Sequence, residues 1–208
     1  MSSGNRPIGM IVVLFLLVLQ VASASSDSKT ILFLGDSLTE GFGVAKEATY
    51  PSQVQALAKS RLNKNINVIN GGVSGSTTSD GLQRLKWYLK RKPDIVFINL
   101  GANDGLRGLN LEKSQKNLEE IVEHAQDSGA TVLLAGMLMP PNYGDEYTKD
   151  FKNMYKKIKD KYNLKYMPFL LKGVAGEKEF NQADGIHPNK KGYKIIAEEV
   201  FEFIKDEL

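Results

Sequence analysis

The chain has 208 residues, 42% hydrophobic and 25% charged, and a formal net charge of +3. This composition is typical of one globular domain with a sizeable core, and it argues against an intrinsically disordered chain and against a multi-span membrane protein. The absence of cysteine excludes a disulfide scaffold, a cysteine nucleophile and a thiolate zinc site, and the presence of only two histidines argues against a histidine-rich metal centre.

The first 24 residues have the features of a secretory signal peptide. Arg6 supplies a positive charge, residues 10–19 are an uninterrupted apolar run, and residues 22–24 (Ala-Ser-Ala) fit a cleavage site. The apolar run is shorter than the roughly 20 residues that span a bilayer. We therefore expect a signal peptide over residues 1–24 and a mature domain over residues 25–208, with an uncleaved N-terminal anchor as the alternative. Cleavage removes one arginine and leaves a net charge of +2, which gives no reason to expect nucleic-acid binding.

The rest of the chain alternates short apolar runs with amphipathic segments. We predict strands over residues 30–34, 66–69, 95–100, 131–135 and 166–170. Apolar residues at helical spacing predict helices over residues 51–62, 82–89, 111–125, 147–162 and 193–204. Strands that are apolar on both faces indicate a parallel sheet covered on both sides. The predicted fold is a three-layer α/β/α sandwich with a mostly parallel sheet of about five strands.

The loops that follow the predicted strands are rich in glycine and in reactive side chains. They comprise residues 35–38, 70–76, 101–105, 139–144 and 184–189. In open parallel α/β sheets, ligands bind beyond the carboxyl ends of the strands. We therefore expect a serine, an asparagine, an aspartate and a histidine from different loops to meet at one edge of the sheet.

These residues suit acyl transfer, which needs a nucleophile, a base, a group that orients the base, and donors for the oxyanion. Ser37 is the candidate nucleophile and His187 the candidate base. Asp184, three residues before His187, can orient the imidazole. The candidate oxyanion donors are the Ser37 main-chain N–H, a glycine N–H in the second loop and the Asn103 side chain.

Each of these residues also has a purely structural interpretation. Ser37 or Asp36 could cap a helix that follows the first strand. Asn103 could be a buried amide that bridges two loops. Asp184 could start the last helix and leave His187 as an ordinary loop histidine. The glycines of the second loop could serve the turn alone.

Four blocks of the sequence carry a resemblance to a known family. "GDSLTEG" at residues 35–41, "NGGVSG" at 70–75, "GAND" at 101–104 and "DGIHPN" at 184–189 resemble the ordered motifs of the SGNH (GDSL-type) hydrolases. The match spans essentially the whole mature chain. The segments "GANDGLRG" and "PPNYGDEY" are similar to those of the bacterial thioesterase, lysophospholipase and arylesterase branch.

The resemblance implies a flavodoxin-like SGNH hydrolase fold and a function for each motif. Ser37 would be the nucleophile, and Asp184 and His187 would complete the triad. Gly75 and Asn103 would complete the oxyanion hole. The loop over residues 140–143 would border an acyl pocket. The candidate substrate-binding residues are Asp36, Leu106, Leu109, Met139, Pro140 and Tyr143.

We therefore expect a secreted serine esterase that cleaves acyl esters or thioesters through an acyl-enzyme, on substrates such as small esters or lysophospholipids. The alternatives are a carbohydrate acetylesterase and a catalytically silent binding protein with the same fold. A nucleotide-binding protein is disfavoured because neither G-x-G-x-x-G nor G-x-x-x-x-G-K-[ST] follows any predicted strand. We expect neither a cofactor nor a metal, and the sequence leaves the oligomeric state open.

The two ends of the chain suggest different locations. The signal-like N-terminus and the family resemblance favour the periplasm or secretion. Residues 205–208 spell Lys-Asp-Glu-Leu, an endoplasmic-reticulum retention signal. Because this tetrapeptide continues a segment rich in lysine and glutamate, we favour the first location and keep the endoplasmic lumen as the alternative.

Overall fold

A computed structural model describes Met1 and residues 28–208. Its centre is one sheet of five strands in the order β2-β1-β3-β4-β5, with every neighbouring pair parallel. The strands are β1 (Thr30–Gly35), β2 (Asn67–Gly72), β3 (Ile95–Asn99), β4 (Thr131–Ala135) and β5 (Lys165–Met167). The predicted signal peptide falls on residues outside those described, apart from Met1.

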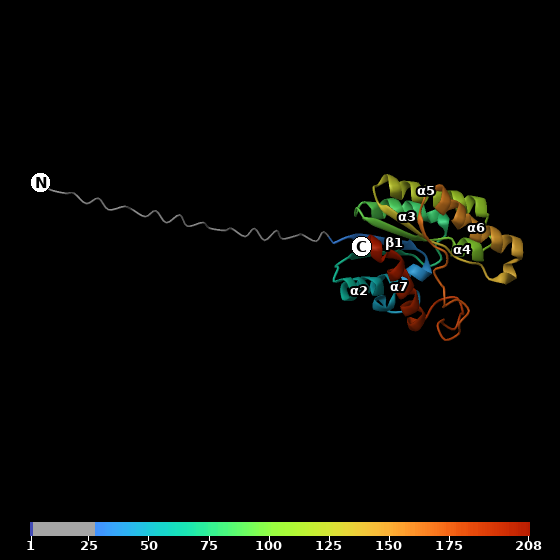
Figure 1. Ribbon diagram of the computed structural model, residues 1–208. Helices are drawn as coiled ribbons and strands as arrows, with labels where there is room; N and C mark the ends of the chain where they lie inside the picture. Colours follow the sequence, from blue (N-terminus) through green and yellow to red (C-terminus); the bar gives the residue numbers. More distant parts are fainter. Residues whose placement is uncertain (2–27) are drawn as a thin grey trace.

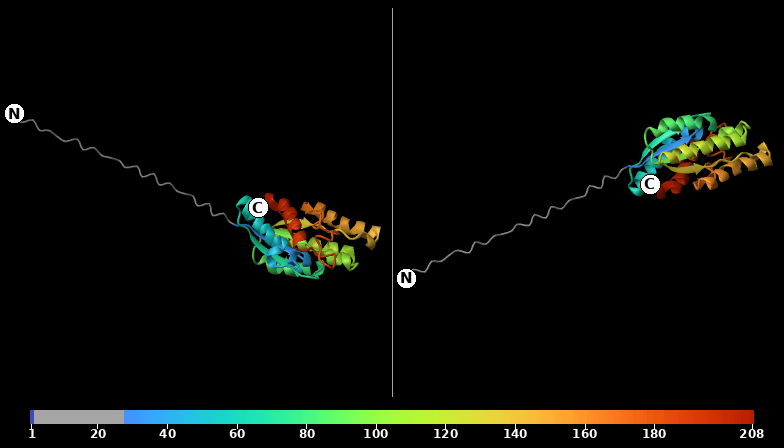
Figure 2. Two further views of the ribbon diagram at one scale, coloured as in Figure 1. Left: turned by 90° about the horizontal axis from the view of Figure 1, so that it is seen from below. Right: turned by 90° about the horizontal axis from the view of Figure 1, so that it is seen from above.

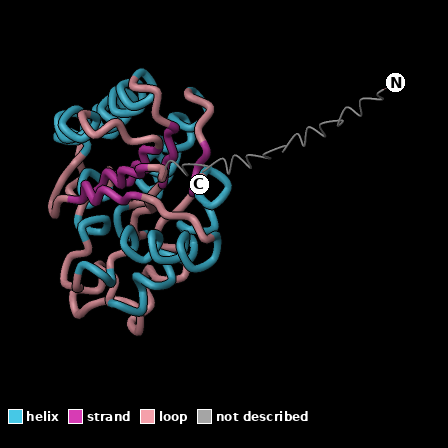
Figure 3. The backbone as a smooth tube through the Cα atoms, turned by 90° about the vertical axis from the view of Figure 1, so that its left-hand side faces the viewer, coloured by secondary structure: helices cyan, strands magenta, loops and turns pink. Residues whose placement is uncertain are grey.

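Helices cover both faces of the sheet. The α-helices are α1 (Ser37–Glu40), α2 (Tyr50–Leu62), α3 (Thr78–Leu89), α4 (Ala102–Leu106), α5 (Leu111–Asp127), α6 (Asp145–Lys161) and α7 (Lys190–Ile204). Three 3₁₀ helices, η1 (Lys46–Ala48), η2 (Pro141–Tyr143) and η3 (Lys205–Glu207), join or follow them. Figure 1 shows α2 and α7 on one face and α3, α5 and α6 on the other. Figures 2 and 3 show the sheet between these two helical layers, which confirms the predicted three-layer sandwich.

The core forms because the central strands are apolar on both faces. Residues 31–34 of β1 and the whole of β3 are buried. Phe33 and Phe97 are partners in the β1–β3 register, and their ring centroids lie 5.3 Å apart. Each such buried side chain contributes about 1.5–3 kcal/mol through removal of apolar surface from water. The sheet is therefore a rigid support for the loops at its edges.

The strand order places a topological switch point between β1 and β3. The chain passes from β1 outward to β2, then crosses back to β3 on the other side of β1. The loops after β1 and β3 consequently leave in opposite directions, and a crevice opens between them. Ser37 follows β1 and Asn103 follows β3, so the two residues flank this crevice.

The element boundaries differ from the predicted ones for local reasons. β2 extends to Gly72 because it pairs along the whole of β1. β5 ends at Met167, before Pro168, instead of reaching residue 170. Several helices begin earlier than predicted because polar side chains cap them, as the capping box of Thr77 and Asp80 does for α3.

Across residues 28–208, no helix combines the length and the apolar character needed to cross a membrane.

Candidate active site

Ser37 lies at a tight turn between β1 and α1. Asp36 is the N-cap of α1, and its Oδ1 accepts a hydrogen bond from the Leu38 N–H at 3.0 Å. Gly35 is required here, since a Cβ at that position would lie 1.9 Å from the Thr39 hydroxyl oxygen. The helix-capping interpretation therefore applies to Asp36, and the Ser37 hydroxyl has a different partner.

That partner is the imidazole of His187, which arrives from the loop before α7. Its Nε2 lies 2.9 Å from Ser37 Oγ, and its Nδ1 lies 2.8 Å from Asp184 Oδ2. The other Asp184 oxygen accepts hydrogen bonds from the main-chain N–H groups of Ile186 and His187, each at 3.0 Å. The structure therefore joins the three candidate triad residues in one hydrogen-bonded chain.

The electrostatics of Asp184 suit a group that stays ionised. Hydrogen bonds from the His187 main-chain N–H and then from its side chain lower the pKa of Asp184 to about 2. A carboxylate with this pKa keeps its charge across the physiological range. It can therefore hold the imidazole in the tautomer with hydrogen on Nδ1, and it can stabilise the imidazolium.

Gly75 and Asn103, the two further oxyanion candidates, border the same cavity as Ser37 and His187. Gly75 has φ +76°, a conformation that favours glycine. The Asn103 side chain donates to the Ser76 carbonyl oxygen at 2.9 Å, so it does bridge two loops as the structural interpretation requires. An amide has two N–H donors, and this hydrogen bond uses one of them.

Asp104, for which the sequence predicts no function of its own, anchors the helix that carries Asn103. Its carboxylate is buried and accepts hydrogen bonds from the main chain and hydroxyl of Thr78 at 2.9 and 2.6 Å, and from the Ser114 hydroxyl at 2.7 Å. These contacts fix α4 to α3 and α5. The only sequence signal for this anchor was its place in the "GAND" block.

The cavity has a volume of about 590 Å³ and is bordered by Ser37, by His187 and by apolar side chains. Ser37, Gly75, Asn103 and His187 contribute its polar rim. The apolar lining includes Leu38, Phe42, Leu106, Met137, Leu138, Met139, Pro140, Phe169, Leu171 and Ile186. Phe42, Phe169 and Leu171 were not predicted, because no motif or periodicity marks them.

Four of the six predicted substrate-binding residues border the cavity, and the other two do not. Leu106, Met139 and Pro140 line the cavity. Asp36 borders it but is only 1% exposed, because its carboxylate caps α1. The prediction that its side chain contacts substrate therefore has no support in this geometry.

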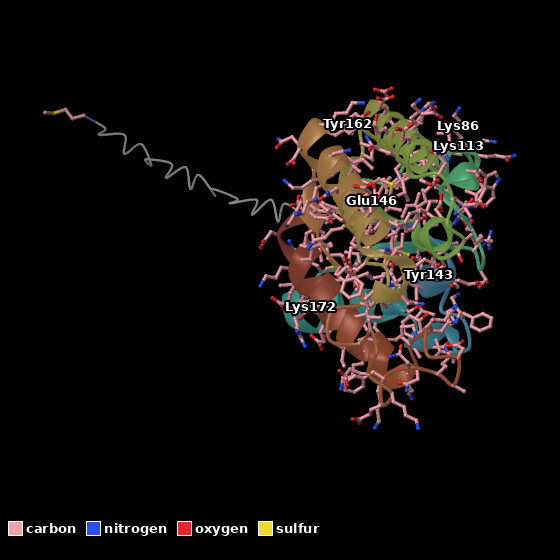
Figure 4. The ribbon with its side chains drawn as sticks, turned by 90° about the vertical axis from the view of Figure 1, so that its right-hand side faces the viewer. Lys86, Lys113, Tyr143, Glu146, Tyr162 and Lys172 are labelled. Atoms are coloured by element: carbon pink, nitrogen blue, oxygen red, sulfur yellow. The ribbon has the colours of Figure 1, made fainter. Side chains whose placement is uncertain are left out.

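Leu109 and Tyr143 lie outside the cavity lining. Leu109 lies beyond the end of α4 and is 41% exposed. Its apolar residue type did not indicate whether its side chain points toward the cavity or away from it. The Tyr143 hydroxyl donates to the Leu106 carbonyl oxygen at 3.1 Å, so Tyr143 fastens the β4–α6 loop to α4. Figure 4 shows Tyr143 in this loop, and it shows labelled lysines such as Lys113 on the outer surface.

Two buried polar atoms near Ser37 have no hydrogen-bond partner among the described residues. They are Oδ2 of Asp36 and Nη2 of Arg84. Burial raises the pKa of Asp36 to about 6, and the nearby Arg84 and His187 charges oppose this rise. Within residues 28–208, no cluster of three or more histidine, cysteine, aspartate or glutamate side chains is arranged to hold a metal ion.

Comparison with known proteins finds the same kind of enzyme repeatedly. The model of the GDSL-like lipase/acylhydrolase family matches residues 33–195. An arylesterase of Vibrio mimicus is 39% identical over 190 residues, which cover 90% of this chain and 92% of the relative. The thioesterase 1/protease 1/lysophospholipase L1 of Escherichia coli (strain K12) is 34% identical over 186 residues, which cover 89% of this chain and 86% of the relative.

Solved structures that resemble this chain include enzymes of the same kind as these relatives. A crystal structure of TesA has a TM-score of 0.82 at 36% identity and covers 86% of this chain and 100% of its own. The psychrotrophic esterase EstA from Pseudoalteromonas sp., in a structure inhibited by monoethylphosphonate, also has a TM-score of 0.82 at 36% identity. It covers 86% of this chain and 98% of its own.

Proposed function

The chain belongs to the GDSL-like lipase/acylhydrolase family and is an ester hydrolase, and from this premise we propose that Ser37, His187 and Asp184 form its catalytic triad. The observation that carries the proposal is the chain of two short contacts through His187, 2.8 Å to Asp184 and 2.9 Å to Ser37. Both distances are within the hydrogen-bond reach that a nucleophile and its base need.

In the proposed mechanism, His187 Nε2 takes the Ser37 hydroxyl proton as Ser37 Oγ attacks the carbonyl carbon of the substrate. The negative charge that develops on the carbonyl oxygen is stabilised by the main-chain N–H groups of Ser37 and Gly75 and by the free N–H of Asn103. The imidazolium then gives its proton to the leaving group. A water molecule, activated by His187, releases the acyl group from Ser37.

The proposed substrates are acyl esters or thioesters with an apolar acyl chain. The lining of Leu106, Met137 and Met139 favours an acyl chain over a sugar, which would need more polar partners. The names of the relatives point the same way, since they include an arylesterase and a thioesterase/lysophospholipase. An acetylxylan esterase is more distant, at 27% identity.

The proposed location is the periplasm or the exterior of the cell, with the endoplasmic lumen as the alternative. Support comes from the signal-like sequence of residues 1–24.

Replacing the nucleophile tests this function directly. The Ser37→Ala variant removes the attacking oxygen, so hydrolysis of a short p-nitrophenyl ester should fall by about 10⁴-fold or more. A fluorophosphonate probe should label the native protein at Ser37 and should not label the variant. Turnover and labelling are measured on the same preparations, with circular dichroism to verify the fold.

Ser60→Ala is the matched control, because Ser60 is an exposed serine on α2 whose hydroxyl, among residues 28–208, donates only to the Leu57 carbonyl oxygen. This variant should be labelled and should turn over ester like the native protein. Near-native turnover by Ser37→Ala would show that Ser37 is not the nucleophile. A native protein that neither turns over ester nor reacts with the probe would favour the silent binding protein.

A further inference from the structure

The phenyl ring of Phe42 covers the imidazole of His187. The two ring centroids lie 4.6 Å apart, and the ring planes are inclined by 38°. Phe42 nevertheless remains 47% exposed and borders the cavity. A large aromatic side chain that is half exposed beside a reactive group has a free face that another molecule can contact.

The main chain of Phe42 is held firmly in this position. Its N–H donates to the Ser37 carbonyl oxygen at 3.1 Å, and its carbonyl oxygen accepts from the Gln182 side chain at 2.7 Å. The Gln182 main-chain N–H in turn donates to the His187 carbonyl oxygen at 2.8 Å. Glycine suits position 43 because its φ is +76° and because a Cβ there would lie 2.2 Å from Gln182 Oε1. The main chain that carries the ring is therefore fixed to both the serine turn and the histidine loop.

The chemistry of acyl transfer determines what lies beside this ring. His187 must pass its proton from Nε2 to the departing oxygen or sulfur, so that atom has to lie within hydrogen-bond reach of Nε2. The carbonyl oxygen is directed instead toward the donors at Gly75 and Asn103. A group attached to the departing atom is consequently next to the side chain that covers the imidazole, which is Phe42.

We propose that the exposed face of Phe42 forms one wall of the leaving-group site and makes the enzyme prefer esters with a flat aromatic leaving group over esters with a small alkyl one. This inference rests on the proposed function, because it takes Ser37 and His187 as the reacting pair. An aromatic leaving group can stack on Phe42 in the offset or edge-to-face arrangement that aromatic pairs favour. The apolar side chain of Ile186, the residue before His187, is 51% exposed and adds apolar surface to the same cavity.

The test compares two esters that share one acyl group, phenyl acetate and ethyl acetate. For each protein, kcat/KM is measured for both esters, and the phenyl-to-ethyl ratio is taken. The Phe42→Leu variant keeps an apolar side chain but loses the aromatic face, so this ratio should fall by about 3- to 10-fold, the effect of one aromatic contact. The Phe42→Met variant should behave in the same way, and Phe42→Trp should retain the native ratio.

The ratio separates a specificity function from a structural one. Damage to the fold lowers the amount of active enzyme, which slows both esters equally and cancels in the ratio. Damage to His187 slows ethyl acetate more than phenyl acetate, because ethoxide is the poorer leaving group and depends more on proton donation, so it would raise the ratio instead of lowering it. Trp87→Leu is the matched control, because Trp87 is an exposed aromatic residue on α3, 57% accessible, that does not border the cavity. Its ratio should equal the native one.

The outcomes distinguish this inference from the function on which it rests. If the native protein hydrolyses both esters and the leucine and methionine variants keep the native ratio, the Phe42 assignment is wrong and the esterase function stands. If the native protein hydrolyses neither ester and the fluorophosphonate probe does not label Ser37, both proposals are overturned together.

Discussion

At the scale of single residues, burial of the Asp36 carboxylate next to Ser37 lowers the stability of the folded protein at neutral pH. It is 1% exposed, one of its oxygens caps α1, and the other has no partner among the described residues. Burial raises its pKa to about 6, whereas the unfolded value is near 4. Between these two values the folded protein binds more protons than the unfolded chain. The free energy of unfolding therefore gains a contribution as the pH falls from about 6 to about 4, and loses it as the pH rises.

The Asp36→Asn variant should be more stable than the native protein at neutral pH. Asparagine is an equally good N-cap, and it removes the buried charge, so the free energy of unfolding at pH 7 should rise by about 1–3 kcal/mol. The difference between variant and native protein should shrink toward pH 4. Urea unfolding of both proteins at a series of pH values between 4 and 7 measures this difference. A variant less stable than the native protein at pH 7 would show that the Asp36 carboxylate has a stabilising partner.

The same substitution should lower activity. The negative charge of Asp36 interacts favourably with positive charge on His187, which forms in the proposed transition state. Stability and activity would then change in opposite directions, as is common for strained or buried groups at active sites.

At the scale of secondary-structure elements, Arg84 of α3 ties the ends of two strands together. Its Nη1 donates to the carbonyl oxygens of Gly35 at 3.0 Å and Gly71 at 2.6 Å, which lie at the ends of β1 and β2. Its Nε donates to Asp80 at 3.0 Å, and Asp80 also accepts from the Ser76 hydroxyl at 2.5 Å. One guanidinium thereby holds the strand ends that lead to the Ser37 turn and to the Gly75 loop.

The Arg84→Lys variant should keep the positive charge but lose the arrangement of N–H donors that contacts Gly35, Gly71 and Asp80. An ammonium group cannot reproduce the planar fork of donors, so the two loops should shift relative to each other. Small misplacements of reacting groups are costly, and we expect kcat to fall roughly 10- to 100-fold with KM changed much less. Steady-state kinetics on a p-nitrophenyl ester separate the two constants.

Arg61→Lys serves as the control, because Arg61 is exposed and pairs with Glu198 at the surface. Equal effects of the two substitutions on kcat would show that Arg84 does not position the Ser37 turn and the Gly75 loop.

The elements also show which features the sequence could predict. β1 and β3 were predicted because residues buried on both faces must form an apolar run. α1 and α4 were not predicted, since helices of four or five residues are too short to show a periodicity.

The same distinction applies to the site. Motifs selected Ser37, Asp184 and His187, and the strand order explains how distant residues meet, although their catalytic functions stay predictions. Phe42 was missed because an exposed aromatic residue among glycines carries no pattern. Leu109 lies outside the cavity lining, because an apolar residue type does not tell which way a loop faces.

At the scale of the whole molecule, residues 205–208 are part of the folded domain. η3 continues α7, and Leu208 packs against the hydrophobic core. The Glu207 side chain pairs with Lys165 at 3.1 Å, and its carbonyl oxygen accepts from Lys29 at 2.5 Å. Lys64 donates to the Leu208 main-chain oxygen. Lys29 lies just before β1, Lys64 just before β2 and Lys165 at the start of β5. The segment therefore packs at the amino-terminal ends of the strands, at the edge of the sheet opposite Ser37.

Deleting residues 205–208 should therefore destabilise the protein without affecting its chemistry. Loss of the Leu208 contact and of partly exposed ion pairs should cost about 1–2 kcal/mol, which lowers the Tm of a domain of this size by about 3–6 °C. Turnover at 25 °C should be unchanged, because the deleted contacts lie at the far edge of the sheet. Differential scanning calorimetry measures the first effect and ester hydrolysis the second.

Asp206→Ala is the control, since it alters the tetrapeptide at an exposed side chain and should leave the Tm unchanged. A deletion that leaves the Tm unchanged would mean that the segment is a free tail in solution, which is the form that recognition as a retention signal requires.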